Sequence, residues 1–138
     1  MGKHLQMTQK PHLKRLCILI LTACSILLAA CNPKGEISGT VTYTDYYDGC
    51  VYPAANTLLY KIEVLSNGTE RMVSSVKAGT DGSFRFDYVK AGNWKISASL
   101  NKEDVIYAAS SSTLSLDKGE HSKVKLHLDM QRLVYACR

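Results

Sequence analysis

The stretch AGTDGSFRFDYVKAGNWKISASL, residues 78–100, decides the fold of this chain. Phe84 and Phe86 alternate with charged residues, and Trp94 and Ile96 alternate with lysine and serine. A period of two places successive side chains on opposite faces of a strand, so each run offers one face to a core. An Ala-Gly turn between the runs returns the chain. The stretch therefore predicts two strands whose Phe84, Phe86, Trp94 and Ile96 side chains share one hydrophobic core.

The same alternation continues through the rest of the chain. Clear runs lie at 37–43, 58–64, 84–88, 94–100 and 124–128, and weaker ones at 70–77, 104–109 and 112–116. Turn signals such as Asn67-Gly68 separate the runs, because Asn-Gly tolerates positive φ. Pro33 and Pro53 fall outside every run, as expected of residues that cannot donate to a ladder. The pattern predicts an all-β domain over residues 35–138, an antiparallel sandwich of about seven short strands without a helix.

Two of these stretches resemble a known family. Residues 35–64 are similar to the opening of carboxypeptidase regulatory-like domains; their sequence is GEISGTVTYTDYYDGCVYPAANTLLYKIEV. Residues 78–100 are similar to the Asp-x-Gly-x-Phe-x-Phe and Ala-Gly-x-aromatic-x-Ile motifs of the same domains. The matching positions of the second stretch are Asp81, Gly82, Phe84, Phe86, Ala91, Gly92, Trp94 and Ile96. The resemblance covers about residues 35–128. It implies a seven-stranded, transthyretin-like Greek-key sandwich that serves as a spacer, folding partner or adhesion module, and it carries no catalytic residue.

The N-terminus has the pattern of an export signal. Residues 1–15 contain four basic and no acidic residues, and residues 16–30 form an apolar run that is short of the roughly 20 residues needed to span a bilayer. The run ends in Leu28-Ala29-Ala30-Cys31, which resembles the lipobox of bacterial lipoproteins. The resemblance implies that residues 1–30 are a signal peptide, that Cys31 is acylated, and that residues 31–34 are a tether. The alternative is a buried cysteine in an uncleaved helix.

Removing residues 1–30 changes what the composition indicates. The chain has 138 residues with 17 basic and 12 acidic side chains, and four of the basic ones lie in the signal. The remaining 108 residues suit one domain and are nearly neutral. They contain no basic run interleaved with aromatic residues, so we expect no nucleic-acid partner.

The five cysteines divide in the same way. Cys17 and Cys24 leave with the signal, and Cys31 carries the lipid. Cys50 and Cys137 remain, an even pair in an exported protein, which predicts a disulfide between them. The alternative is two free, partly buried thiols.

The stretch YTDYYDGCVYP, residues 43–53, is the candidate binding loop. It combines tyrosines with two aspartates at the end of the first predicted strand; its candidate binding residues are Asp45, Tyr46, Tyr47, Asp48 and Tyr52. Tyrosine offers a rigid apolar surface and a hydroxyl, which suits a sugar or a protein. Two alternatives are that Tyr43 and Tyr52 are core residues of an ordinary turn, and that Asp45 and Asp48 bind calcium.

Other chemistry finds little support. His121 and His127 are six residues apart on one predicted strand, roughly 20 Å, so they cannot share a zinc ion. No Gly-x-Ser-x-Gly elbow is present. We therefore expect no metal, no cofactor and no enzymatic activity.

Two functions fit these observations. The first is a non-enzymatic, membrane-anchored surface lipoprotein whose sandwich binds a glycan or protein. The second is a structural or assembly subunit of an envelope complex with no ligand of its own. Asn32 follows the predicted lipidated cysteine, and by analogy with enterobacterial sorting the absence of aspartate there favours the outer membrane.

Overall fold

The computed structural model describes residues 34–133. The predicted signal peptide, Cys31 and Cys137 lie outside the described residues. The described chain forms nine strands: β1 (Gly35–Thr44), β2 (Val51–Pro53), β3 (Leu58–Val64), β4 (Glu70–Lys77), β5 (Ser83–Val89), β6 (Gly92–Lys102), β7 (Val105–Ser110), β8 (Leu114–Leu116) and β9 (His121–Leu133). The all-β class is thus confirmed. Within residues 34–133 there is no helix of the length and apolar character that crossing a membrane requires.

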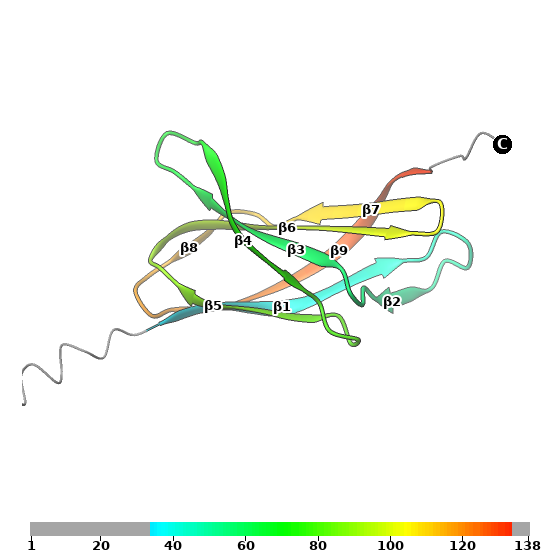
Figure 1. The fold of residues 1–138 in the computed structure, drawn as a ribbon, viewed down its shortest axis with the longest axis horizontal. Helices are drawn as coiled ribbons and strands as arrows, with labels where there is room; N and C mark the ends of the chain where they lie inside the picture. The colour runs from blue at the N-terminus through cyan, green and yellow to red at the C-terminus, as the bar shows by residue number, and fades with distance from the viewer. Residues whose placement is uncertain (1–33, 134–138) are drawn as a thin grey trace, which may run out of the picture. The chain divides into compact units, whose positions relative to one another are not determined.

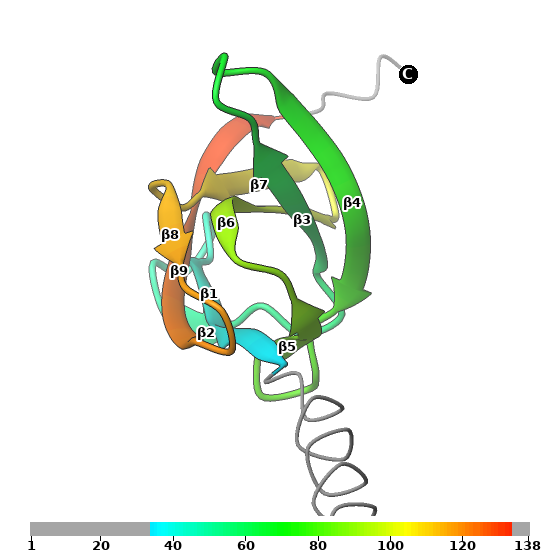
Figure 2. The ribbon, with the colours of Figure 1, turned by 90° about the vertical axis from the view of Figure 1, so that its left-hand side faces the viewer.

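The strands form one curled mixed sheet in the order β2-β1-β9-β7-β6-β3-β4, with β5 paired to β1 and β8 paired to β6. Figures 1 and 2 show how the sheet closes around a central core. We call β1, β2, β5 and β9 sheet A, and β3, β4, β6, β7 and β8 sheet B. Strand β9 belongs to both halves, because its first part pairs with β1 and its last residues pair with β7.

Three details of the predicted strand arrangement are wrong. The structure has nine strands, of which β2 and β8 have only three residues, and β1 and β9 run parallel. Turn motifs in a sequence indicate hairpins between consecutive strands. Strands β1 and β9 come from the two ends of the described domain and are not joined by a turn, so no such motif marks their pairing. Pro53 also lies inside a strand, at the last position of β2. It is tolerated there because β2 is an edge strand that pairs only with β1 in the described chain.

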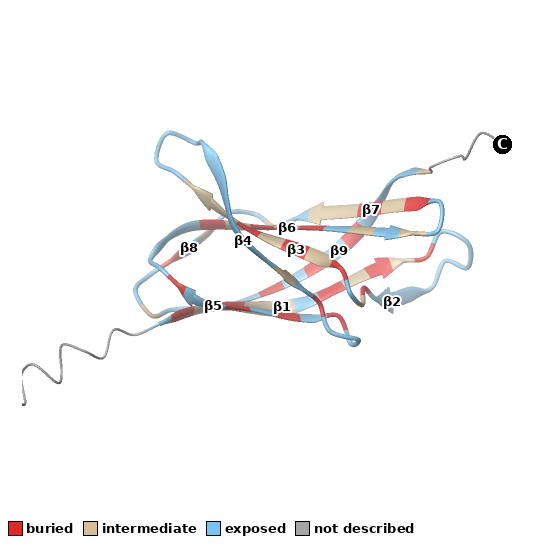
Figure 3. Ribbon diagram, viewed as in Figure 1, coloured by how far each residue is buried: buried red, intermediate tan, exposed pale blue. Residues whose placement is uncertain are grey.

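The four residues predicted to share a core, Phe84, Phe86, Trp94 and Ile96, are all buried. Figure 3 shows buried positions along β5 and β6, the strands that carry them. The Phe84 and Phe86 rings lie 6.1 Å apart in an edge-to-face arrangement. Trp94 Nε1 donates a hydrogen bond to the Lys90 carbonyl at 2.9 Å, so its polar atom is satisfied. Burial of these large side chains is the main driving force for closing the sandwich.

Tyr88 breaks the alternation that Phe84 and Phe86 begin. Gly35 pairs with Val89 and Glu36 with Asp87, so Tyr88 is the extra residue of a β-bulge. Its φ is +59°, and its side chain is exposed. The buried position that the alternation assigned to it is taken by Val89 instead.

Strand β3 directs a lysine into the core. Leu59 and Lys61 are its buried residues, while Leu58 and Tyr60 are only half buried. The Lys61 Nζ atom lies 5.6 Å from the centre of the Phe86 ring and 5.1 Å from that of Trp94. Cation–π attraction to these rings partly compensates for the hydration that the ammonium group loses on burial. Burial still lowers the pKa of Lys61.

The turn between β4 and β5 ties sheet A together. Gly82 has a φ of +77°, and a Cβ atom added to it would lie 2.4 Å from the Val41 carbonyl oxygen. The Val41 N–H donates to the Gly82 carbonyl at 2.9 Å, and the Val41 carbonyl accepts from Ala54 N–H at 2.9 Å. The middle of β1 is therefore fixed to the chain that leaves β2, which positions the loop between β1 and β2.

Candidate binding site at the tyrosine-rich end

The candidate stretch, residues 43–53, contains a loop at residues 45–50 that joins β1 to β2 at one end of the sandwich. Asp45 N–H donates to the Cys50 carbonyl, and Gly49 N–H donates to the Asp45 carbonyl, both at 2.9 Å. These bonds close the loop, and pairing of Tyr43 with Tyr52 extends it into the β1–β2 ladder. We call this loop, with Tyr43 and Tyr52, the tyrosine-rich end.

Asp45 is the buried anchor of the loop. One carboxylate oxygen, Oδ1, accepts from the Tyr47 N–H at 2.9 Å. The other, Oδ2, accepts from Lys102 Nζ at 2.6 Å. Lys102 is the last residue of β6, so this ion pair holds the loop against the β6–β7 hairpin. The hydrogen bond from Lys102 holds the pKa of Asp45 below its ordinary value, and the bond to Asp45 raises the pKa of Lys102.

Two tyrosine rings enclose the same ammonium group. Lys102 Nζ also donates to the Tyr43 hydroxyl at 2.8 Å, and it lies 5.1 Å from the centre of the Tyr43 ring and 5.7 Å from that of Tyr52. Hydrogen bonds and cation–π attraction therefore act on one charge. This combination fixes both ends of the loop.

Asp48 stabilises the second half of the loop. Its Oδ1 accepts from the Cys50 N–H at 2.8 Å, and its Oδ2 accepts from the Tyr52 hydroxyl at 2.7 Å. The hydrogen bond to the Asp48 carboxylate raises the pKa of Tyr52 to about 12. Tyr52 is therefore a neutral donor at physiological pH.

Tyr46 and Tyr47 carry the free aromatic surface of the site. Their side chains are 49% and 62% exposed, and their rings lie 5.2 Å apart at 79°. The Tyr46 N–H donates to the hydroxyl of the buried Tyr107 at 3.0 Å, which holds the backbone below the rings. Two exposed rings on a fixed backbone present apolar faces for stacking and two hydroxyls for hydrogen bonds.

A hollow of about 340 Å³ lies beside Tyr46. His127, Leu128, Asp129 and Met130 of β9 are among the residues that line it. The His127 ring is held on both sides, with Nδ1 3.0 Å from Thr42 Oγ1 and Nε2 3.1 Å from Thr44 Oγ1. The hollow thus brings an imidazole and a carboxylate next to the aromatic surface.

The surroundings of the rings are acidic. Partial desolvation raises the pKa of Tyr47, and the carboxylates of Asp104 and Glu103 raise it further. Both acidic residues lie in the tight connection between β6 and β7. Carboxylates beside an aromatic face can accept hydrogen bonds from a ligand rich in hydroxyl groups.

The structure brings all five predicted loop residues to one end of the sandwich. Tyr43 is a core residue, as one alternative held, but Tyr52 is 39% exposed. Cys50 is exposed, and its predicted disulfide partner lies outside the described residues. Within residues 34–133, no group of three or more histidine, cysteine or carboxylate side chains is placed to hold a metal ion.

Sequence reasoning missed two residues that build the site. Lys102 and Tyr107 are 57 and 61 residues from the loop positions they contact, Asp45 and Tyr46. Neither is part of a motif. Only the pairing of β6 with β7 and their approach to β1 reveal them.

The similarity of this chain to known proteins is limited to the fold. No protein-family model matches the chain, and no curated protein matches it. The solved structure of a proposed carbohydrate-binding protein from Pseudomonas aeruginosa is similar, with a TM-score of 0.51 and 16% identity over 75% of this chain and 95% of that one. The minor pilin GBS52 from Streptococcus agalactiae has a TM-score of 0.53 and 12% identity, over 77% of this chain and 48% of the pilin. An (S)-allantoin synthase has a TM-score of 0.43 and 12% identity, over 91% of this chain and 55% of the synthase.

Proposed function

We propose that this protein is a non-enzymatic binding module and that its tyrosine-rich end recognises a glycan. The observation that carries the proposal is the pair of exposed rings, Tyr46 and Tyr47, on a loop whose backbone is held by Asp45, Lys102 and Tyr107. Loops at the end of a rigid sandwich are the usual place for recognition. The carbohydrate binding proposed for the similar Pseudomonas protein agrees with this ligand class.

The fixed loop favours binding because little conformational freedom is left to lose. A ligand that stacks on Tyr46 and Tyr47 covers apolar ring surface without having to order the backbone. The hydroxyls of sugars would find acceptors in the neighbouring carboxylates and in the hollow beside Tyr46. These features suit a neutral, hydroxyl-rich ligand.

The proposal includes a lipid anchor at Cys31, with the domain held at the outer membrane by a short tether. It rests on the apolar run and the Leu-Ala-Ala-Cys sequence at residues 28–31. A tether of a few residues would keep the tyrosine-rich end close to envelope polymers.

A glycan array tests the function directly. We expect the wild-type domain to bind at least one neutral glycan, and the Tyr46→Ala/Tyr47→Ala double variant to lose that binding. Tyr88→Ala is the control, because Tyr88 is also exposed but lies near the end of β5. Unchanged binding by the double variant, or an array without a signal, would refute the assignment.

A second candidate function is that of an assembly subunit. In the described chain β4 pairs only with β3, and its residues Glu70–Ser75 are exposed on both faces, including Met72 and Val73. Figure 1 shows the β3–β4 hairpin projecting from the rest of the domain. Such an edge can accept a strand from another protein. A photo-crosslinker at Val73 should then capture one stoichiometric envelope protein in intact cells, whereas a crosslinker at Ser115 of β8 should not.

A further inference from the structure

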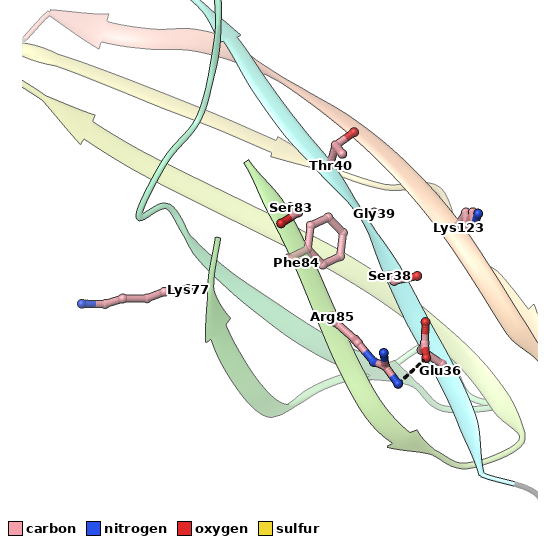
Figure 4. Close-up of a pocket in the computed structure, with 9 residues that line it drawn as sticks. All are labelled: Glu36, Ser38, Gly39, Thr40, Lys77, Ser83, Phe84, Arg85 and Lys123. Atoms are coloured by element: carbon pink, nitrogen blue, oxygen red, sulfur yellow. Dashed lines mark ion pairs between the residues drawn. The ribbon is translucent and has the colours of Figure 1, made fainter. Parts of the chain in front are cut away.

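The outer face of sheet A combines hydroxyl groups with positive charge. A shallow hollow of about 580 Å³ lies on it, next to β1, β5 and β9. Figure 4 shows Lys77 and Lys123 on opposite sides of this hollow, with Ser38, Thr40 and Ser83 between them. The size is in the range of ligand sites, roughly 300–1,000 Å³.

Strand register explains this arrangement. Ser38 of β1 pairs with Arg85 of β5 on one side and with Lys123 of β9 on the other. Two residues further along the same face, Thr40 pairs with Ser83 and with Lys125. Neighbouring strands are about 4.8 Å apart. The register therefore creates two parallel rows across the strands, Arg85–Ser38–Lys123 and Ser83–Thr40–Lys125. In each row a hydroxyl of β1 pairs with at least one cationic residue.

Most of the cationic side chains on this face form no ion pair within the described residues. Arg85 is engaged, with Nη2 2.8 Å from Glu36 Oε2 and Nε 2.6 Å from Asp87 Oδ1. Lys77, Lys123 and Lys125 form no ion pair with any of residues 34–133. All three are exposed. The face thus has an excess of positive charge, and Arg85 is held in a fixed position at its edge.

We propose that this face is a second binding site, for a glycan polymer that bears carboxylate groups. The polymer would lie along β1, with its hydroxyls against Ser38, Thr40 and Ser83. Its carboxylates would meet the ammonium groups of Lys77 and Lys123. The site is separate from the tyrosine-rich end, where Asp48, Glu103 and Asp104 would repel a polyanion.

A glycan fits this face better than a membrane surface does. Proteins that lie on anionic membranes combine positive charge with exposed apolar side chains that enter the lipid. None of the exposed large hydrophobic residues of the described chain lies in the two rows, and Tyr88 of β5 and Met130 of β9 lie further along their strands. The rows offer hydroxyl groups instead, which match those of a sugar.

Polygalacturonate, with one carboxylate on each sugar, is the probe. We expect the wild-type domain to bind it in low salt and to bind more weakly as salt rises. The fully methyl-esterified polymer has the same backbone without charge and should not bind. The Lys77→Ser/Lys123→Ser variant should bind about three- to thirtyfold more weakly, since an exposed ion pair contributes up to about 1 kcal/mol.

Two further variants separate the possible explanations. Lys90→Ser/Lys118→Ser loses the same charge from turns outside the hollow and should retain binding. Tyr46→Ala/Tyr47→Ala should also retain it, because the two sites are independent. Fluorescence-detected urea unfolding of each variant confirms that it is folded.

The proposal is overturned if polygalacturonate does not bind in low salt, if the esterified polymer binds equally, or if the Lys77→Ser/Lys123→Ser variant loses no more binding than the Lys90→Ser/Lys118→Ser variant. Binding only to anionic lipid vesicles would also overturn it. Loss of polygalacturonate binding in the tyrosine variant alone would place the polymer at the other site, with the same consequence. A failed neutral-glycan array with intact polygalacturonate binding would refute only the function proposed above.

Discussion

Lys102 Nζ lies 2.6 Å from Asp45 Oδ2 and thereby joins two segments that are 57 residues apart in the sequence. The same ammonium group donates to the Tyr43 hydroxyl. One lysine thus connects the end of β6 to the end of β1, and the tyrosine-rich loop is held between them.

Replacing this lysine should release the loop without unfolding the core. In Lys102→Met, the Asp45 carboxylate loses its bond from Lys102 Nζ and keeps the one from the Tyr47 N–H. The rings of Tyr46 and Tyr47 would then have to be ordered on binding, so we expect glycan affinity to fall by about tenfold. Titration calorimetry measures it, and an unchanged affinity would show that the ion pair does not preorganise the loop.

Acid should have a related effect on the loop. The pKa of Asp45 is lowered in the folded protein from 3.8, so its contribution to stability is present above that value and is lost as pH falls through the folded pKa. The protection of the Tyr47 amide against hydrogen exchange, corrected for the intrinsic pH dependence of exchange, should therefore fall as the pH drops through the folded pKa of Asp45. In Asp45→Asn this protection should change much less over the same pH range, because the variant lacks the titrating group.

Trp94→Ala tests the core. Trp94 is 3% exposed and contacts the core from β6, so its truncation should lower the free energy of unfolding by about 3–5 kcal/mol. Urea denaturation measures this loss. Tyr88→Ala, at an exposed position, should cost far less, and equal losses would contradict the assigned burial.

Lys61→Met should stabilise the protein at neutral pH. The folded state lowers the pKa of Lys61 below 10.5, so folding disfavours the charged form. Stability in the wild type therefore rises as pH increases from the folded pKa towards 10.5, and the variant should lack this rise. We expect a gain of about 0.5–2 kcal/mol, reduced by the lost attraction to Phe86 and Trp94. A loss of stability at pH 7 would mean that the aromatic contacts outweigh desolvation.

Gly82→Ala and Gly68→Ala separate steric clash from backbone strain. Both glycines have positive φ, but an added Cβ meets the Val41 carbonyl oxygen at 2.4 Å only at Gly82, and nothing within 4 Å at Gly68. We expect about 1–2 kcal/mol of destabilisation at Gly68 and clearly more at Gly82. Thermal unfolding compares them, and equal effects would argue against the tight contact with β1.

The lipid anchor is tested by mass spectrometry of the protein made in its native host. We expect a mature N-terminus at Cys31 that carries acyl chains, and a Cys31→Ala variant that retains residues 1–30. An intact Met1 on the wild-type protein would contradict the anchor.

The sequence by itself determined the all-β class and the aromatic core. Alternation is a property of consecutive residues, so Phe84, Phe86, Trp94 and Ile96 could be assigned to one face before any strand was paired. The alternation assigned the wrong face to Tyr88, because a β-bulge there exchanges inward and outward positions. It also could not decide which face of β3 would be buried. Local pattern contains no information about a partner strand.

Only the tertiary structure decided the rest. The parallel pairing of β1 with β9, the Lys102–Asp45 contact and the hydroxyl and lysine rows of sheet A all join segments far apart in the sequence. Such contacts depend on strand register, which is set by the packing free energy of the whole core rather than by neighbouring residues. The sequence could therefore name the residues of the tyrosine-rich loop, but not the lysine that holds it.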